Sequence, residues 1–176
     1  MQVGDVITQI DGPMTREGIK AYAKASGDMN PIHIDEDFAT NRGGLNGVIA
    51  HGMFFYGFAI RLINNIAKQN NAKIASIGCE FRGMVRPGDW VITKAIVKSI
   101  EGKKVTFEIN QVSKMPLKLE KDGAVVKTFE GQTRNWLKPN PAKVPEGSVK
   151  TETTPEGVLT FQEYISIPGK AVLELP

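Results

Sequence analysis

The chain has 176 residues, 41% hydrophobic and 23% charged, so we expect one compact domain plus an appendage, with a core of its own. The net charge is +3 and the basic residues are scattered. This pattern argues against nucleic acid as a partner and suits an anionic small ligand or an ordinary soluble surface. Cys79 is the only cysteine, which excludes an internal disulfide and favours a reducing, cytoplasmic location. We expect no signal peptide and no membrane partner, because the N-terminus lacks a basic and apolar leader and the apolar stretch 48–60 is short.

The first half of the chain predicts a strand, two helices and a long loop. Residues 3–10 alternate loosely, as in a short strand, and Thr15 is a suitable cap for a helix that ends at Gly27. Residues 27–47 are rich in Gly, Asn and Pro and predict a structured loop with short helical pieces, a kind of segment that often carries function. Residues 48–68 predict one long helix, buried because it is apolar around most of its circumference.

The second half predicts mostly strands. Four runs separated by turn residues suggest an antiparallel meander, at 74–85, 90–100, 105–119 and 124–137. One buried helix followed by a meander predicts an α+β fold in which the sheet wraps around the helix. Proline becomes frequent after residue 138. We therefore divide the chain into a domain over 1–137 and a Pro-rich linker with a C-terminal arm over 138–176, and we expect the arm to pack across a partner subunit.

The chain has only two histidines, and both lie in short segments that suggest chemistry. Asp28 precedes His33 by five residues, on a segment too rich in Gly, Asn and Pro to be regular helix. A carboxylate and an imidazole held on a shaped loop predict a general acid/base pair. Gly52 follows His51 at the entrance of the apolar helix. Backbone N–H groups and the helix dipole at such a place can bind an oxyanion.

Each of these residues also has a structural interpretation. Asp28 and Asn30 are typical turn residues, and Gly52 is also explained by close packing. We interpret His51 as a structural histidine bound to backbone, in preference to a catalytic one. Two histidines and nearby acids suggest a metal, but no HExxH or other tight ligand spacing occurs, so we expect no metal ion.

Together the motifs resemble the MaoC-like (R)-specific enoyl-CoA hydratases and dehydratases, which have the hot-dog fold. The residues that carry the resemblance are Tyr22, the run Ser-Gly-Asp-Met-Asn-Pro-Ile-His at 26–33, and Ile-Ala-His-Gly-Met at 49–53. The strand and turn at 81–89 also match, and the likeness covers roughly residues 3–137. It implies an antiparallel sheet wrapped around a long central helix, followed here by a C-terminal extension.

The resemblance also implies a reaction. Asp28 and His33 would activate one water for reversible syn addition across a trans-2-enoyl thioester, giving an (R)-3-hydroxyacyl thioester. The Gly52 N–H would bind the thioester carbonyl, and Asn30 would hold the loop and the water. No cofactor is implied beyond CoA as part of the substrate, and the partner would be a second copy or a related hot-dog subunit. The sequence departs from some members at Gly57, where a hydroxyl residue can stand.

We place further residues around the substrate. His51 and Met53 flank Gly52 and are expected to contact the acyl thioester. Arg82 is expected to bind the phosphates of its carrier, and Arg86 and Lys94 are further candidates for that role.

Three other functions remain open. A hot-dog acyl-CoA thioesterase often carries an acid on the central helix, whereas residues 53–68 contain no carboxylate. In a heterodimeric acyl dehydratase this chain would be the catalytic subunit, because it keeps Asp28, Asn30 and His33. A binding module for acyl carriers would have no need of the acid/base pair.

Overall fold

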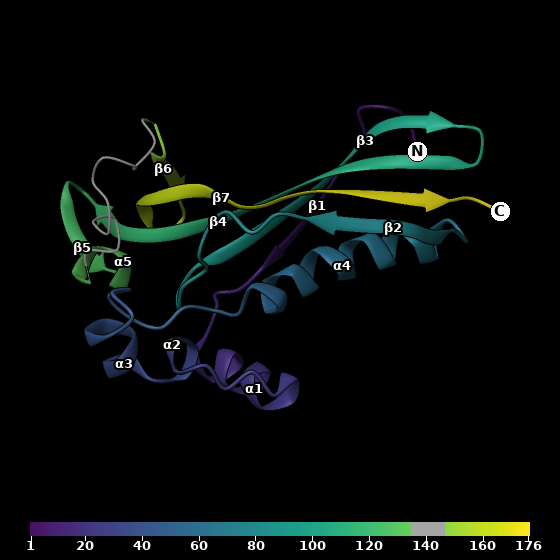
Figure 1. Cartoon of the computed structure of the whole chain (residues 1–176). Helices are drawn as coiled ribbons and strands as arrows, with labels where there is room; N and C mark the ends of the chain where they lie inside the picture. Colours follow the sequence, from purple (N-terminus) through teal and green to yellow (C-terminus); the bar gives the residue numbers. More distant parts are fainter. Residues whose placement is uncertain (135–146) are drawn as a thin grey trace.

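The protein is described by a computed structural model over residues 1–134 and 147–176, in which one antiparallel sheet is covered on one face by a long helix (Figure 1). The helices are α1 (Arg16–Ser26), α2 (Pro31–Ile34), α3 (Glu36–Asn41), α4 (Gly52–Gln69) and α5 (Glu130–Thr133). The strands are β1 (Val6–Asp11), β2 (Lys73–Cys79), β3 (Trp90–Glu101), β4 (Lys104–Lys121), β5 (Ala124–Thr128), β6 (Val149–Thr154) and β7 (Gly157–Glu174).

The helix ends follow the sequence. The Thr15 side chain accepts the N–H of Gly18, and Gly27 ends α1 in the left-handed conformation with φ 77°, as predicted. The long helix α4 begins at Gly52, four residues later than predicted, because residues 48–51 are extended and the Ala50 N–H donates to the Val85 carbonyl at 2.8 Å. Among the described residues, no helix combines the length and the hydropathy needed to cross a bilayer.

The core lies between α4 and the inner face of the sheet. Buried residues of α4 pack against buried residues of β3, β4 and β7, among them Phe55, Ala59 and Ile63 of the helix and Val97, Phe107 and Leu173 of the strands. Alternate residues of each strand face this layer, so the sheet supports the helix along its length.

The sheet order is β1-β3-β4-β7-β2, with β5 on the free part of β4 and β6 on the free part of β7. The expected hairpins between β3 and β4 and between β4 and β5 are present. The expected meander is wrong at its start, because β2 pairs with β7 and not with β3. The runs predicted at 74–85 and 124–137 are also shorter as strands, since β2 ends at Cys79 and β5 at Thr128.

The division of the chain at residue 137 is also wrong. Strand β7 pairs with β4 from Lys104 opposite Glu174 to Glu120 opposite Val158, and β2 lies on its other side. It is therefore an interior strand of the same sheet, with Leu173 fully buried against the core. The prolines after residue 138 suggested a boundary, but a strand between two others must bury one face. The Pro-rich linker itself falls largely in 135–146, outside the described residues.

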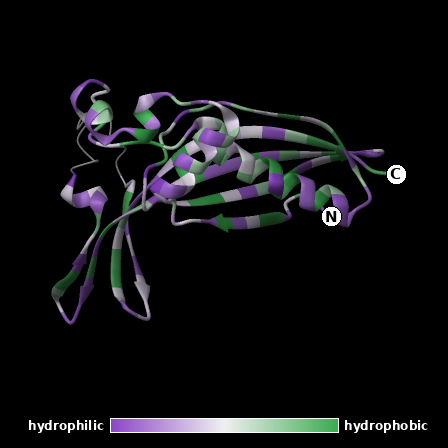
Figure 2. Ribbon diagram, turned by 90° about the horizontal axis from the view of Figure 1, so that it is seen from below, coloured by the Kyte–Doolittle hydropathy of each residue, from purple (hydrophilic) through white to green (hydrophobic). Residues whose placement is uncertain are grey.

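Strands β4 and β7 are 18 residues each, and their far halves carry β5 and β6 as a projecting ribbon (Figures 1 and 2). Ion pairs join α5, at the base of this ribbon, to α1 and α3. Arg16 contacts Glu36 at 2.5 Å and Glu130 at 3.0 Å, and Arg134 contacts Glu36 at 2.9 Å. This network ties the ribbon to the short helices around the loop at 27–33.

A buried carboxyl joins β7 to the turn before β3. Asp89 is fully buried, and its Oδ2 accepts the Arg86 N–H at 2.9 Å and lies 2.9 Å from the Tyr164 hydroxyl. That hydroxyl also donates to the Met84 carbonyl at 2.5 Å. The Tyr164 hydroxyl is thus shared between two acceptors, Asp89 Oδ2 and the Met84 carbonyl oxygen. Burial raises the pKa of Asp89 to about 7, against the hydrogen bonds from Arg86 and Tyr164.

This buried acid predicts a pH dependence of stability. Between about pH 4 and about pH 7 the folded protein retains a proton that the unfolded chain has lost, so the free energy of unfolding should fall as pH rises. The substitution Asp89→Asn introduces a side chain that is uncharged at every pH, so it removes this pH dependence. We expect the free energy of unfolding of the variant minus that of the wild type, measured with urea, to be larger at about pH 8 than at about pH 5. An equal difference at both pH values would contradict a protonated Asp89.

Candidate active site

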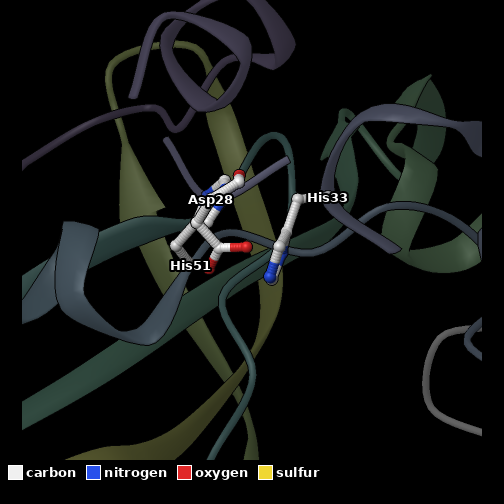
Figure 3. A group of neighbouring side chains, drawn as sticks. All are labelled: Asp28, His33 and His51. Atoms are coloured by element: carbon white, nitrogen blue, oxygen red, sulfur yellow. The ribbon is translucent and has the colours of Figure 1, made fainter. Parts of the chain in front are cut away.

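The loop between α1 and α2 is shaped by short-range hydrogen bonds. The Asp28 Oδ1 accepts the Asn30 N–H at 3.2 Å, and the Asn30 side chain caps α2 by accepting the Ile32 N–H at 3.2 Å. Pro31 occupies the first turn of α2, where its missing N–H costs nothing. The loop thus holds the Asp28 carboxylate five residues before the His33 imidazole (Figure 3).

The hydrogen bond of His33 defines its neutral form. Its Nδ1 lies 2.7 Å from the carbonyl oxygen of Ile49. Since a carbonyl only accepts, Nδ1 carries the proton and Nε2 is the basic nitrogen of the neutral ring. Burial lowers the pKa of His33, the Ile49 carbonyl and Asp28 raise it, and the nearby His51 lowers it further, with a net decrease. His33 is therefore prepared to accept a proton near neutral pH.

His51 lies between the acid/base loop and α4. Its Nε2 is 2.9 Å from the carbonyl oxygen of Asp28, and its ring stacks on that of His33 with centroids 3.7 Å apart and planes 26° apart. Only 2% of its surface is exposed. His51 is thus bound to backbone, as the structural interpretation of the sequence expects.

The start of α4 opens into a pocket of about 330 Å³, whose wall includes Asp28, His51, Gly52, Met53 and Phe81. The first N–H groups of a helix have no acceptor within it, and α4 has no side-chain cap at its N-cap residue. These N–H groups and the helix dipole can bind a negatively charged oxygen in the pocket. A Cβ at Gly52 would stand 3.0 Å from ring carbons of Phe81, so the missing side chain keeps this approach open.

The predicted site residues do not all meet. Asp28, His51, Gly52 and Met53 line the pocket, while His33 is 8% exposed and lies beyond the wall, stacked on His51. Asn30 acts within the loop as the α2 cap.

The residues proposed for phosphates lie apart from the pocket wall. Arg82 is exposed and pairs with Glu80 at 2.6 Å. Arg86 is buried, which argues against contact with a carrier at the surface, and Lys94 is exposed on β3.

Sequence reasoning missed part of the pocket wall. Ser26 lines the pocket with Tyr22, and its hydroxyl donates to the Tyr22 carbonyl at 2.8 Å. The spacing of four residues on α1 places both on one helix face, which is a signal that the sequence does contain. Phe81, by contrast, reaches the pocket from the segment after β2, and no local pattern indicates it.

The described residues that could hold a metal ion are Asp28, His33 and His51, each with a ligand atom within 4.8 Å of the others. Ring nitrogens donate their lone pairs in the plane of the ring. Because the two rings are stacked, these lone pairs lie side by side and do not converge on one point. A ring would have to turn before both histidines could bind one ion, so the arrangement suits proton transfer better.

A second hollow of about 330 Å³ lies at the other end of α1, between Thr15, Asp89 and Phe129. Its polar side chains are largely held within the protein, since Asp89 Oδ2 contacts Tyr164 and Arg16 pairs with two glutamates. Among the described residues, Asp89 Oδ1 and Arg16 Nη2 have no hydrogen-bond partner. We place the candidate active site in the pocket at the start of α4, because Asp28 and free backbone donors meet there and His33 lies just behind its wall.

Comparison with known families identifies the family of this chain. Residues 2–118 match the model of the MaoC like domain. The chain belongs to the MaoC-like family. The matched range contains the acid/base loop, the start of α4 and most of the sheet, and it ends before β7.

Two curated relatives share part of the chain. A "3-hydroxyacyl-thioester dehydratase Y" of Mycobacterium tuberculosis is 40% identical over 86 residues, which are 48% of this chain and 29% of the relative. A "Fatty acid synthase subunit beta" of Saccharomyces cerevisiae is 37% identical over 99 residues, 54% of this chain and 5% of the relative. The chain therefore spans less than a third of either protein.

Solved structures confirm the fold. An (R)-hydratase from A. caviae superposes with a TM-score of 0.62 at 17% identity, covering 100% of this chain and 98% of that one. The ChsH1-ChsH2 complex of Mycobacterium tuberculosis has a TM-score of 0.61 at 14% identity, covering 99% and 98%. The α+β hot-dog fold expected from the sequence is confirmed, as is its family.

Proposed function

We propose that this protein is a hydro-lyase that reversibly hydrates a trans-2-enoyl-CoA to an (R)-3-hydroxyacyl-CoA, with no cofactor beyond the CoA of its substrate. The observation that carries the proposal is that Asp28 lines the pocket at the N-terminus of α4, while a ring nitrogen of His33, behind the pocket wall, lies within 4.8 Å of the Asp28 carboxylate. Membership of the MaoC-like family and relatives named as dehydratases support a reaction of this class.

We assign a role to each group. A water held between the Asp28 carboxylate and Nε2 of His33 attacks C3 of the substrate and gives one proton to this pair. The electrons of the double bond move towards the thioester carbonyl, whose oxygen the Gly52 N–H stabilises. The pair then returns a proton to C2, so that one water is added in total. In the dehydration direction the same steps run backwards.

A partner subunit belongs to the proposal. Met53 and Phe81, at the pocket wall, are 55% and 51% exposed, which is unusual for large apolar side chains that face a reaction site. We infer that an acyl chain or a second hot-dog subunit covers them. This chain would then form a homodimer or be the catalytic member of a heterodimer. Structural neighbours include complexes of two different subunits, such as ChsH1-ChsH2.

A thioesterase is the second candidate on this fold. The 18 residues of α4 contain no Asp or Glu, so this helix supplies no carboxylate for ester cleavage. Release of free thiol without change at the double bond would identify that activity.

The direct test is the hydration of crotonyl-CoA. The reaction is monitored through the loss of absorbance of the conjugated double bond, and the product is then identified by chiral analysis. We expect (R)-3-hydroxybutyryl-CoA from the wild type. Asp28→Asn and His33→Ala should each lower kcat at least ~100-fold, because each removes one member of the acid/base pair. Asp37→Asn, which makes the same charge change at an exposed position of α3, should keep the wild-type rate.

Two outcomes would count against the assignment. Near-normal rates in folded Asp28→Asn and His33→Ala variants would remove these residues from the chemistry. An (S)-product would show that water reaches the opposite face of the double bond.

The two glycines of α4 offer a matched pair for the oxyanion role. Gly52→Ala would push its Cβ against Phe81 at the pocket, so we expect kcat/KM to fall by about 10- to 100-fold. At Gly57 a Cβ meets nothing within 4 Å, so Gly57→Ala should leave kcat/KM unchanged. It should also raise stability by about 0.5–1 kcal/mol through helix propensity, as thermal unfolding would measure. Equal kinetics in both variants would argue against Gly52 as the oxyanion donor.

A further inference from the structure

We propose that His51 is a positioning residue for the acid/base pair, which it orients by holding the backbone of Asp28 and by stacking on the ring of His33. The inference rests on the proposed hydration, since that reaction gives the pair its task.

The first contact fixes the acid. Nε2 of His51 donates to the Asp28 carbonyl at 2.9 Å, because the carbonyl only accepts. The Asp28 carboxylate itself accepts the Asn30 N–H within the same loop. His51 thus supplies a contact from another segment, 23 residues away, and sets where the loop stands relative to the start of α4.

The second contact fixes the base. His51 is the middle ring of an aromatic column, with His33 at 3.7 Å on one side and Tyr22 at 5.0 Å on another. Tyr22 in turn stacks on Phe54 of α4 at 4.9 Å. The His33 ring is therefore held by the Ile49 carbonyl at Nδ1 and by His51 across its face, which leaves Nε2 with a defined direction.

The same arrangement directs the proton to His33. Nδ1 of His51 is buried and has no hydrogen-bond partner in the described part of the chain. A proton there would create a charged N–H without an acceptor, beside a ring that must itself become charged during the reaction. The other titratable groups that face the pair are the Asp28 carboxylate from the loop and the Tyr22 phenol from α1. We therefore assign His33 as the nitrogen base that takes up the proton.

Three variants separate the two contacts. His51→Gln keeps a donor near the position of Nε2 but loses the stacked ring, and His51→Phe keeps the ring but loses the donor. His51→Ala loses both. We expect kcat on crotonyl-CoA to fall about 10-fold in the Gln and Phe variants and about 100-fold in the Ala variant, because misplacing a reacting group costs about that much. KM should change less than threefold, because the Gly52 N–H and the other residues of the pocket wall remain.

A measurement independent of activity is available because the chain has only two histidines. In a long-range ¹H–¹⁵N NMR spectrum of the wild type, we expect His33 to be protonated at Nδ1 and His51 at Nε2. In the Gln and Phe variants His33 is the sole histidine. Its pKa should rise, because the neighbouring His51 lowers it in the wild type. The acidic limb of the pH profile of kcat/KM should then move to higher pH, because a protonated His33 cannot act as base.

The proposal is overturned if folded His51→Ala keeps kcat within twofold of the wild type, or if the pKa of His33 is unchanged in the Gln and Phe variants. Thermal unfolding identifies a variant that does not fold, and the two conservative variants then carry the test. If the wild type hydrates no enoyl thioester, the proposed function fails by itself, while the NMR titration still decides whether His51 orients His33.

Discussion

The extended segment at 49–51 is the constraint on which the candidate site depends. The Ile49 N–H donates to the Ile32 carbonyl at 3.2 Å, and the Ile49 carbonyl accepts Nδ1–H of His33 at 2.7 Å. Two residues later, His51 donates to the carbonyl of Asp28. The same segment then becomes the first turn of α4. The acid, the base and the helix N-terminus are therefore positioned by three consecutive residues.

This segment is in turn supported by the C-terminal strand. The Ala50 N–H donates to Val85, and the segment before Val85 lies along β7, where the Arg82 N–H donates to the Ser166 carbonyl at 3.0 Å. The Ser166 hydroxyl donates to the Gln111 carbonyl of β4 at 3.0 Å. Residues more than a hundred positions away thus hold the wall behind the site. Strand β7 therefore supports the candidate site, although the family match ends at residue 118.

The sequence predicts what depends on local order. The cap at Thr15, the end of α1 at Gly27 and the buried helix α4 all follow from short-range patterns, and so does the placement of Asp28 near His33. The chain has only two histidines, and both lie in short motifs that precede α4, which is a strong signal. The Gly, Asn and Pro residues of 27–47 also predict the loop that precedes this helix.

What the sequence could not predict depends on partners that are distant along the chain. The prolines before β7 predict a separate arm, whereas the pairing of β7 with β4 and β2 depends on strands that are distant along the chain. Arg82 was expected at the substrate, but Glu80 lies two residues away and pairs with it. The ring stack of His33 and His51 joins residues that are eighteen positions apart, and only the fold brings them together.

The measurement that tests the central claim most directly is a crystal structure of the protein with (R)-3-hydroxybutyryl-CoA bound. We predict the C3 hydroxyl within hydrogen-bond distance of both the Asp28 carboxylate and Nε2 of His33, and the thioester carbonyl oxygen about 2.7–3.1 Å from the Gly52 nitrogen. A thioester bound away from the start of α4, or a hydroxyl that faces neither Asp28 nor His33, would contradict the assignment of this pocket as the active site.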